Sequence, residues 1–123
     1  MTFTEKRQWE RLPVSCEARY CDRESFFVPH KSAQLLDIHH RGCRMLSGSL
    51  FERGDIVTIM VNLPVEGLLS MDGMVAWSSP VGQPQAIETG VRFLTYDPST
   101  EETYRKLFDF CLLKNPDYRE TFY

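Results

Sequence analysis

Two arginines near the N-terminus, Arg7 and Arg11, stand in an R-x-x-x-R arrangement with Lys6 beside them. A guanidinium group presents a planar fork of N–H donors, which matches phosphate oxygens and the O6 and N7 acceptors of guanine. Residues four apart share one side of a helical turn and also of an extended strand. The pair is therefore suited to joint recognition of a phosphate or a guanine, but taken alone such a pair is usually part of an ordinary solvated surface. Arg19 and Arg23 have the same spacing, and no role is assigned to them.

A second polar segment, residues 37–42, reads Asp-Ile-His-His-Arg-Gly and closes a predicted strand. The carboxylate of Asp37 can accept hydrogen bonds from the N–H groups of a guanine Watson–Crick edge. We expect Gly42 to supply a positive φ in a tight turn, and a glycine also lets a ligand approach the backbone closely. An ordinary hairpin with a polar tip explains the same residues, and the segment taken alone favours that interpretation.

Other chemistries find less support in the sequence. His39, His40 and Cys43 are metal-ligating residue types, but adjacent residues of a strand point to opposite faces, so a common site has poor geometry. No nucleophile lies in a recognisable elbow or helix start, and no glycine-rich phosphate loop is present. We therefore expect a binding protein without a metal or cofactor, and not an enzyme.

The composition fits one globular domain of 123 residues, with 42% apolar and 25% charged residues. The formal net charge of −3 disfavours binding of nucleic-acid polymers or anionic membranes by bulk electrostatics. No apolar run is long enough to span a bilayer, and residues 1–11 lack the apolar core of a signal peptide. Cys16, Cys43 and Cys111 fall on apolar faces, as reduced core cysteines do, so we expect a cytoplasmic protein.

Apolar residues recur at every second position in six short segments, as they do in half-buried strands. The fifth segment is expected to place Val75 and Trp77 on the buried face and to end before a loop at 78–84, which is rich in Ser, Pro and Gly. Short strands at this spacing predict a small antiparallel barrel or sandwich. The predicted strands cover about residues 14–20, 33–39, 43–46, 57–63, 69–77 and 87–95.

The hydrophobic period changes near residue 97. Tyr104, Leu107, Phe108 and Cys111 recur at i, i+3, i+4 and i+7, which predicts an amphipathic helix that covers an open end or face of the β structure. The chain then divides into an N-terminal arm at 1–11, a barrel with its helix at 12–116 and an aromatic tail at 117–123. The tail either packs back on the barrel or offers a patch to a partner or to a second copy in a homodimer.

Together these features resemble the PilZ family, in which an R-x-x-x-R arm precedes the first strand and a [D/N]-x-S-x-x-G motif closes the second. Arg7 and Arg11 match the first motif. Asp37 and Gly42 match the second, and His39 stands at its serine position. The likeness continues along nearly the whole chain, through residues 54–55, 62–64, 73–77 and 90–93 and into the helix.

The resemblance implies a six-stranded antiparallel β-barrel with a C-terminal helix, and a bacterial receptor for cyclic di-GMP. In family members that bind this nucleotide, the arginines grip phosphates and guanine edges, while the acidic and serine positions help to hold a guanine. The implied ligand-binding residues are Arg7, Arg11, Asp37, His39 and Gly42. Binding would draw the arm onto the barrel and change the surface shown to an unidentified downstream protein.

The alternative is a PilZ-fold adaptor that has lost nucleotide binding and works through protein contacts alone. It arises because the imidazole of His39 is much larger than the hydroxymethyl group of the serine that the family pattern has there.

Overall fold

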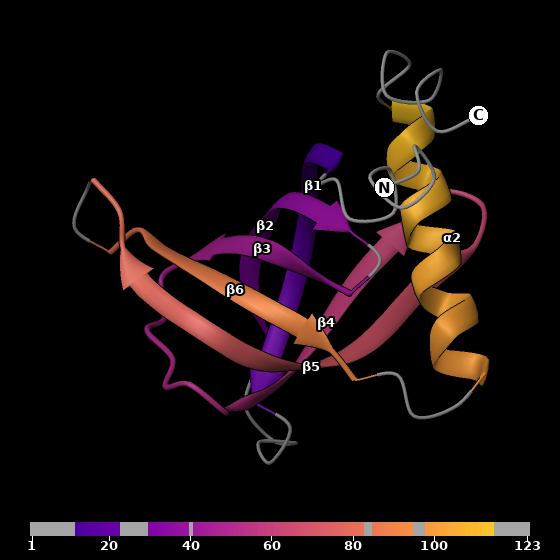
Figure 1. The fold of residues 1–123 in the computed structure, drawn as a ribbon. Coiled ribbons are helices and arrows are strands. Elements are labelled where there is room, and N and C mark those ends of the chain that lie inside the picture. The colour runs from indigo at the N-terminus through magenta and orange to yellow at the C-terminus, as the bar shows by residue number, and fades with distance from the viewer. Residues whose placement is uncertain (1–11, 23–29, 40, 83–84, 95–97, 115–123) are drawn as a thin grey trace, which may run out of the picture.

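The computed structural model describes residues 12–22, 30–39, 41–82, 85–94 and 98–114. Six antiparallel strands close into a barrel in the order β1-β2-β3-β6-β5-β4, and one helix follows them (Figure 1). The predicted six-stranded barrel with a C-terminal helix is confirmed. The elements are β1 Leu12–Asp22, β2 Lys31–His39, β3 Gly42–Ser47, β4 Ile56–Leu63, β5 Gly67–Pro80, β6 Ile87–Phe93 and α2 Pro98–Lys114.

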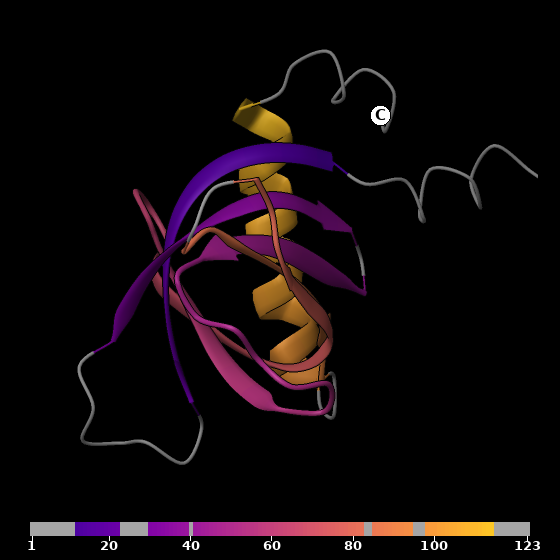
Figure 2. The ribbon, with the colours of Figure 1, turned by 90° about the vertical axis from the view of Figure 1, so that its left-hand side faces the viewer.

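Every second side chain of the strands fills the barrel. In β1, Cys16, Ala18 and Tyr20 are buried, while Glu17 and Arg19 between them are exposed. Figure 2 shows the strands wrapping around this interior, with α2 behind them. The same alternation buries residues of all the other strands, among them Leu35, Met45, Ile59, Met71 and Val91. Cys16, Cys43 and Cys111 are buried and form no disulfide, in agreement with the predicted reduced core cysteines.

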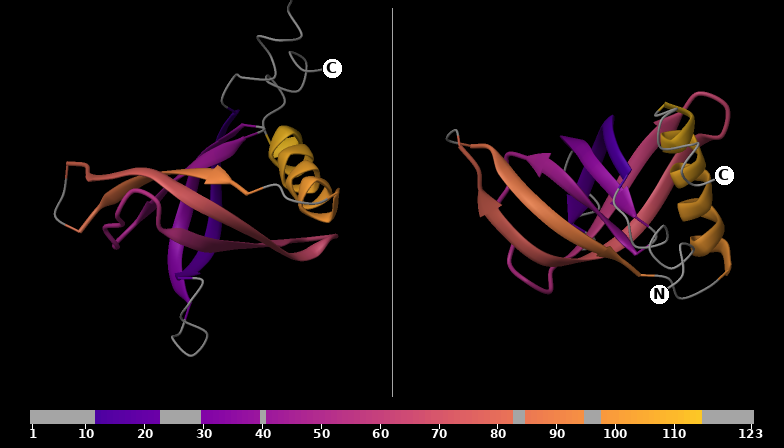
Figure 3. Two further views of the ribbon diagram at one scale, coloured as in Figure 1. Left: turned by 60° about the horizontal axis from the view of Figure 1, so that its bottom comes forward. Right: turned by 45° about the horizontal axis from the view of Figure 1, so that its top comes forward.

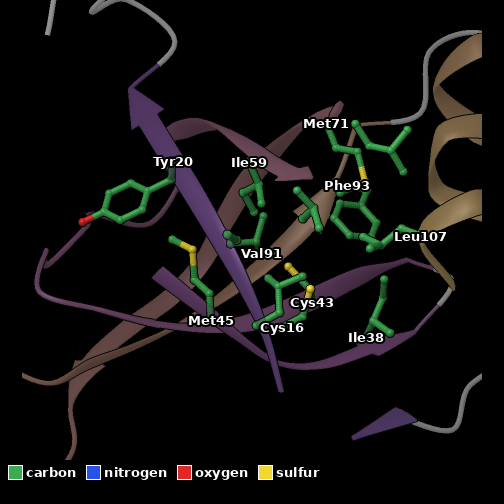
Figure 4. Packing of buried hydrophobic residues seen from close by; sticks show 14 of the residues in the cluster. Cys16, Tyr20, Ile38, Cys43, Met45, Ile59, Met71, Val91, Phe93 and Leu107 are labelled. Carbon is green, nitrogen blue, oxygen red and sulfur yellow. The ribbon is translucent and has the colours of Figure 1, made fainter. Parts of the chain in front are cut away.

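The helix α2 closes one end of the barrel, on the side away from the projecting β5–β6 hairpin (Figure 3). Leu107 is fully buried and lies next to Phe93 of β6 (Figure 4). The rings of Phe93 and Tyr104 also meet, with their centroids 5.6 Å apart. Tyr104, Phe108 and Cys111 belong to the same packed face, so the predicted apolar stripe of the helix is confirmed.

Hydrogen bonds of hydroxyl groups stabilise the end of the barrel opposite α2. The Tyr20 hydroxyl lies 2.5 Å from Ser49 Oγ, and its ring packs edge-on against Phe51 at 5.6 Å. The backbone N–H of Phe51 donates to Ser78 Oγ at 3.2 Å, and Ser78 shares a 2.9 Å hydrogen bond with the fully buried Thr89. The segment between β3 and β4 is thereby fixed to both sides of the barrel.

Three register shifts break the alternation, one each in the β1–β2, β2–β3 and β5–β6 pairs. In β5 the register shifts between Val75 and Trp77, so Trp77 turns to the outer face, where it is 41% exposed. The prediction that Trp77 points inward was therefore wrong, because a bulge adds one residue and reverses the faces that follow it. The predicted loop at 78–84 was also wrong in part, since β5 continues to Pro80 in pairing with β6.

Gly42 does not adopt the positive φ that the sequence suggested; the glycines that do are Gly54, Gly67 and Gly82. It is instead the first residue of β3 and pairs with Arg92 of β6. A Cβ atom at Gly42 would collide with the carbonyl oxygen of Val91. The glycine is thus required by close approach of two strands, rather than by the shape of a turn.

Gly42→Ala should lower the free energy of unfolding by about 1–3 kcal/mol, the usual cost of an overpacked core. Urea unfolding followed by circular dichroism measures this change. Gly48→Ala is the matched control, because a Cβ there would lie 3.7 Å from the Gln85 carbonyl oxygen, an ordinary contact. The control should change stability by less than about 0.5 kcal/mol. Equal unfolding midpoints for the two variants would contradict the collision with β6.

Candidate functional site

One row of register partners crosses four strands on the outer face of the barrel. Asp37 of β2 pairs with Arg44 of β3, Arg44 pairs with Gly90 of β6, and Gly90 pairs with Trp77 of β5. Neighbouring strands lie about 4.8 Å apart, so the backbone at Asp37 is within about 15 Å of that at Trp77. A carboxylate, a guanidinium group and an indole ring are therefore aligned on one outward surface.

Asp37 owes its place in this row to the bulge in β2. The register of β2 against β3 shifts between Leu35 and Asp37. Leu35 and Ile38 both point into the core and are fully buried. Leu36 is the additional residue, and it leaves Asp37 on the outer side beside Arg44. β-bulges next to functional sites often redirect a side chain in this way.

An ion-pair network connects three strands at this point. Arg44 Nε lies 2.9 Å from Asp37 Oδ2, although its N–H is not directed well enough at the carboxylate for a hydrogen bond. Arg44 Nη1 donates to Glu88 Oε1 of β6 at 2.6 Å. The hydrogen bond to Glu88 raises the pKa of the Arg44 guanidinium above its usual value, so its positive charge persists at every relevant pH. The Asp37 side chain is 5% exposed, against 38% for Arg44.

Trp77 lies over Gly90, where the absence of a side chain leaves room for the indole ring. A Cβ atom at Gly90 would occupy the position of the indole ring. Beside them is a shallow pocket of about 210 Å³. It reaches from the β5–β6 pair to the turn between β2 and β3, and its lining includes His39, Arg41, Ala76, Trp77, Gly90 and Arg92. Its apolar floor and cationic rim suit a flat, anionic ligand.

His39 closes the turn that leads from β2 to β3. The backbone N–H of Arg41 donates to His39 Nδ1 at 3.2 Å. This contact from a side chain to the N–H two residues later is the one that a serine hydroxyl makes in a turn of the same kind. The imidazole therefore helps to hold the turn between β2 and β3, and it also lines the pocket.

The structure brings three predicted site residues together. Asp37, His39 and Gly42 lie within the paired ends of β2 and β3. Arg7 and Arg11 are outside the described residues. Sequence reasoning missed Arg44 and Glu88 because their importance rests on cross-strand pairing, and it missed Trp77 as an outward residue because the bulge could not be read from alternation.

Among the described residues, other kinds of site have no comparable geometry. Within the described residues, no three His, Cys, Asp or Glu side chains are placed to hold a metal ion. No helix in that part of the chain is long and apolar enough to cross a membrane. A separate open groove of about 1060 Å³ runs over β1, β2 and β4, and it contains Arg19 but neither Asp37 nor His39.

Comparison with solved structures finds the same fold. The PilZ domain of YcgR from Escherichia coli, with c-di-GMP, aligns with a TM-score of 0.67 over 90% of this chain and 95% of that chain, at 14% identity. MrkH from K. pneumonia, in complex with c-di-GMP, gives 0.67 over 88% of this chain and 53% of MrkH, at 10% identity. PlzA from Borreliella burgdorferi, in complex with c-di-GMP, gives 0.51 over 92% and 55%, at 11% identity.

Comparison with curated protein sequences gives no significant match. The sequence itself matches the PilZ domain family over residues 5–110. That match begins in the arm, includes all six strands of the closed barrel and extends into α2. This chain therefore belongs to the PilZ domain family.

Proposed function

We propose that this PilZ domain is a cytoplasmic receptor for cyclic di-GMP, which acts by binding and not by catalysis. The backbone register of β1 carries the proposal. Leu12, the residue directly after Arg11, pairs with Ile38, and Pro13 pairs with Asp37. Because consecutive Cα atoms are about 3.8 Å apart, this pairing keeps the root of the arm within reach of Asp37. It supports one shared site for the arginine pair and the outer row.

The chemistry of the outer row fits a cyclic dinucleotide. The N–H donors of a guanine Watson–Crick edge complement the carboxylate of Asp37. A purine can stack on the exposed indole of Trp77, which lines the neighbouring pocket. Arg7 and Arg11 would hold phosphates and the second guanine through their N–H groups. Family membership and the likeness to PilZ structures determined with c-di-GMP support a receptor for this nucleotide.

Ligand binding would order the arm on the barrel and so create a surface for a downstream protein. A fixed arm, the ligand and the outer row would then form one continuous face, which is absent without the nucleotide. Such an order–disorder change is a common way for a small domain to signal. The ligand would favour the state in which the arm lies on the barrel, because it would bind that state more tightly than the state with the arm undocked.

A second candidate function is a PilZ-fold adaptor without nucleotide binding. The departure at His39 favours it, because the family pattern has serine there. Against it stands the hydrogen bond from the Arg41 N–H to His39 Nδ1, through which the imidazole maintains the turn. Calorimetric titration of the protein with cyclic di-GMP distinguishes the two candidates directly.

Replacing Arg7 or Arg11 by alanine should weaken cyclic di-GMP binding by about 1–3 kcal/mol, the scale of a hydrogen bond to a charged group. Rising salt should weaken wild-type binding as well, because it screens the attraction between arginine and phosphate. Arg19→Ala is the control, since Arg19 lies in the separate groove over β1, β2 and β4. If calorimetry shows the same loss for Arg19→Ala as for Arg7→Ala, the assignment of the arm is wrong.

Amide hydrogen exchange at residues 5–11 should slow markedly when cyclic di-GMP is added. The expected cause is that the arginines become fixed between the ligand and the barrel, which protects the neighbouring backbone. Exchange in β4 serves as the internal reference, because β4 pairs with residues 19–22 of β1, at the end of that strand away from Leu12 and from Asp37. Equal protection of the arm with and without ligand would argue against signalling by ordering.

His39→Ser should retain cyclic di-GMP binding, because a serine hydroxyl can accept the same Arg41 N–H in a turn. His39→Ala removes the acceptor and should weaken binding by about 1 kcal/mol, the net value of one hydrogen bond. Titration calorimetry on the three proteins measures the differences. If the wild type does not bind and His39→Ser does, the imidazole blocks the site and the adaptor function is favoured.

A further inference from the structure

The proposed function uses Asp37 to hold a guanine, but Asp37 does not stand alone. Its side chain is almost fully buried, and an arginine from the next strand lies 2.9 Å from one of its oxygens. A buried carboxylate is costly unless a cation or hydrogen-bond donors compensate it, and its orientation then follows that of its partners. The residue that fixes Asp37 is therefore as relevant to recognition as Asp37 itself.

We infer that Arg44 is the positioning residue of this site: anchored on Glu88 of β6, it holds the Asp37 carboxylate in place for the guanine. The inference rests on the proposed function and assigns Arg44 no contact with the ligand. Arg44 and Asp37 are direct register partners, so the ion pair needs only one strand spacing. Gly90, the partner of Arg44 on β6, has no side chain of its own to compete for Arg44.

The anchor on Glu88 explains why Arg44 can be held firmly although it is 38% exposed. An exposed arginine paired with a single carboxylate loses side-chain entropy and gains little. Here the guanidinium group bridges two carboxylates on two different strands, at 2.9 Å and 2.6 Å. The three side chains connect β2, β3 and β6, and each of these strands is fixed by its own core residues.

A double-mutant cycle separates positioning from direct contact with the ligand. Arg44→Gln should weaken cyclic di-GMP binding about tenfold, the equivalent of one charged contact. In the Asp37→Asn background the same substitution should have little effect, because the carboxylate that Arg44 orients is gone. Glu88→Gln should weaken binding by a smaller factor. Arg53→Gln, in the exposed turn before β4, makes the same change of charge and should leave the affinity unchanged.

Two results would overturn the inference. An equal loss from Arg44→Gln in both backgrounds would show that Arg44 touches the ligand itself, and no loss in either would remove Arg44 from the site. Arg44→Lys, which keeps the charge but not the bridge, should fold and bind with intermediate affinity if Arg44→Gln fails to fold. If the wild type does not bind at all, the proposed function fails. Urea unfolding midpoints of the wild type, Arg44→Gln, Asp37→Asn and the double variant then test the interaction between Arg44 and Asp37. If the effects of the two substitutions on the midpoint simply add, the positioning role is overturned.

Discussion

The register of β2, β3, β6 and β5 is the constraint on which the outer site depends. Side chains of a strand alternate between faces, so a slip of one residue would exchange the core for the surface. The bulge in β2 is fixed by the buried Leu35 and Ile38 on either side. The bulge in β5 is fixed by the buried Val75 and by Ser78, which is hydrogen-bonded to the buried Thr89. The hydrophobic interior thereby determines which polar and aromatic groups face outward, although none of them belongs to it.

The sequence was sufficient for those parts of the fold that follow from local periodicity. The strands, their buried faces and the apolar stripe of α2 could be read from alternation and from helical spacing. Trp77 could not, because a bulge leaves no distinct mark in the sequence around it. Gly42 shows the same limit, since a local turn was inferred where a contact with Val91, distant in sequence, is the actual cause.

The charged network is better explained by recognition than by stability. A buried or half-buried ion pair contributes little net stability, because desolvation of both partners offsets their attraction. An apolar pair of similar size between β2 and β3 would serve the fold as well. Under the proposed function, the network would add a carboxylate whose direction is fixed from two strands before a ligand arrives, and a group held in place in advance loses less entropy on binding.

The barrel itself is poorly suited to transmit a signal by changing shape. Fully buried side chains from β2, β3, β4, β5 and α2 meet in one core, and such packing resists continuous deformation. A ligand bound on the outer face would therefore cause little movement in the barrel beneath it. The proposed signal instead uses the arm, which joins the barrel at Leu12, where β1 begins its pairing with β2 beside Asp37. The ligand's free energy is then available mainly to fix the arm, so a partner protein would recognise a surface composed of arm, nucleotide and outer row together.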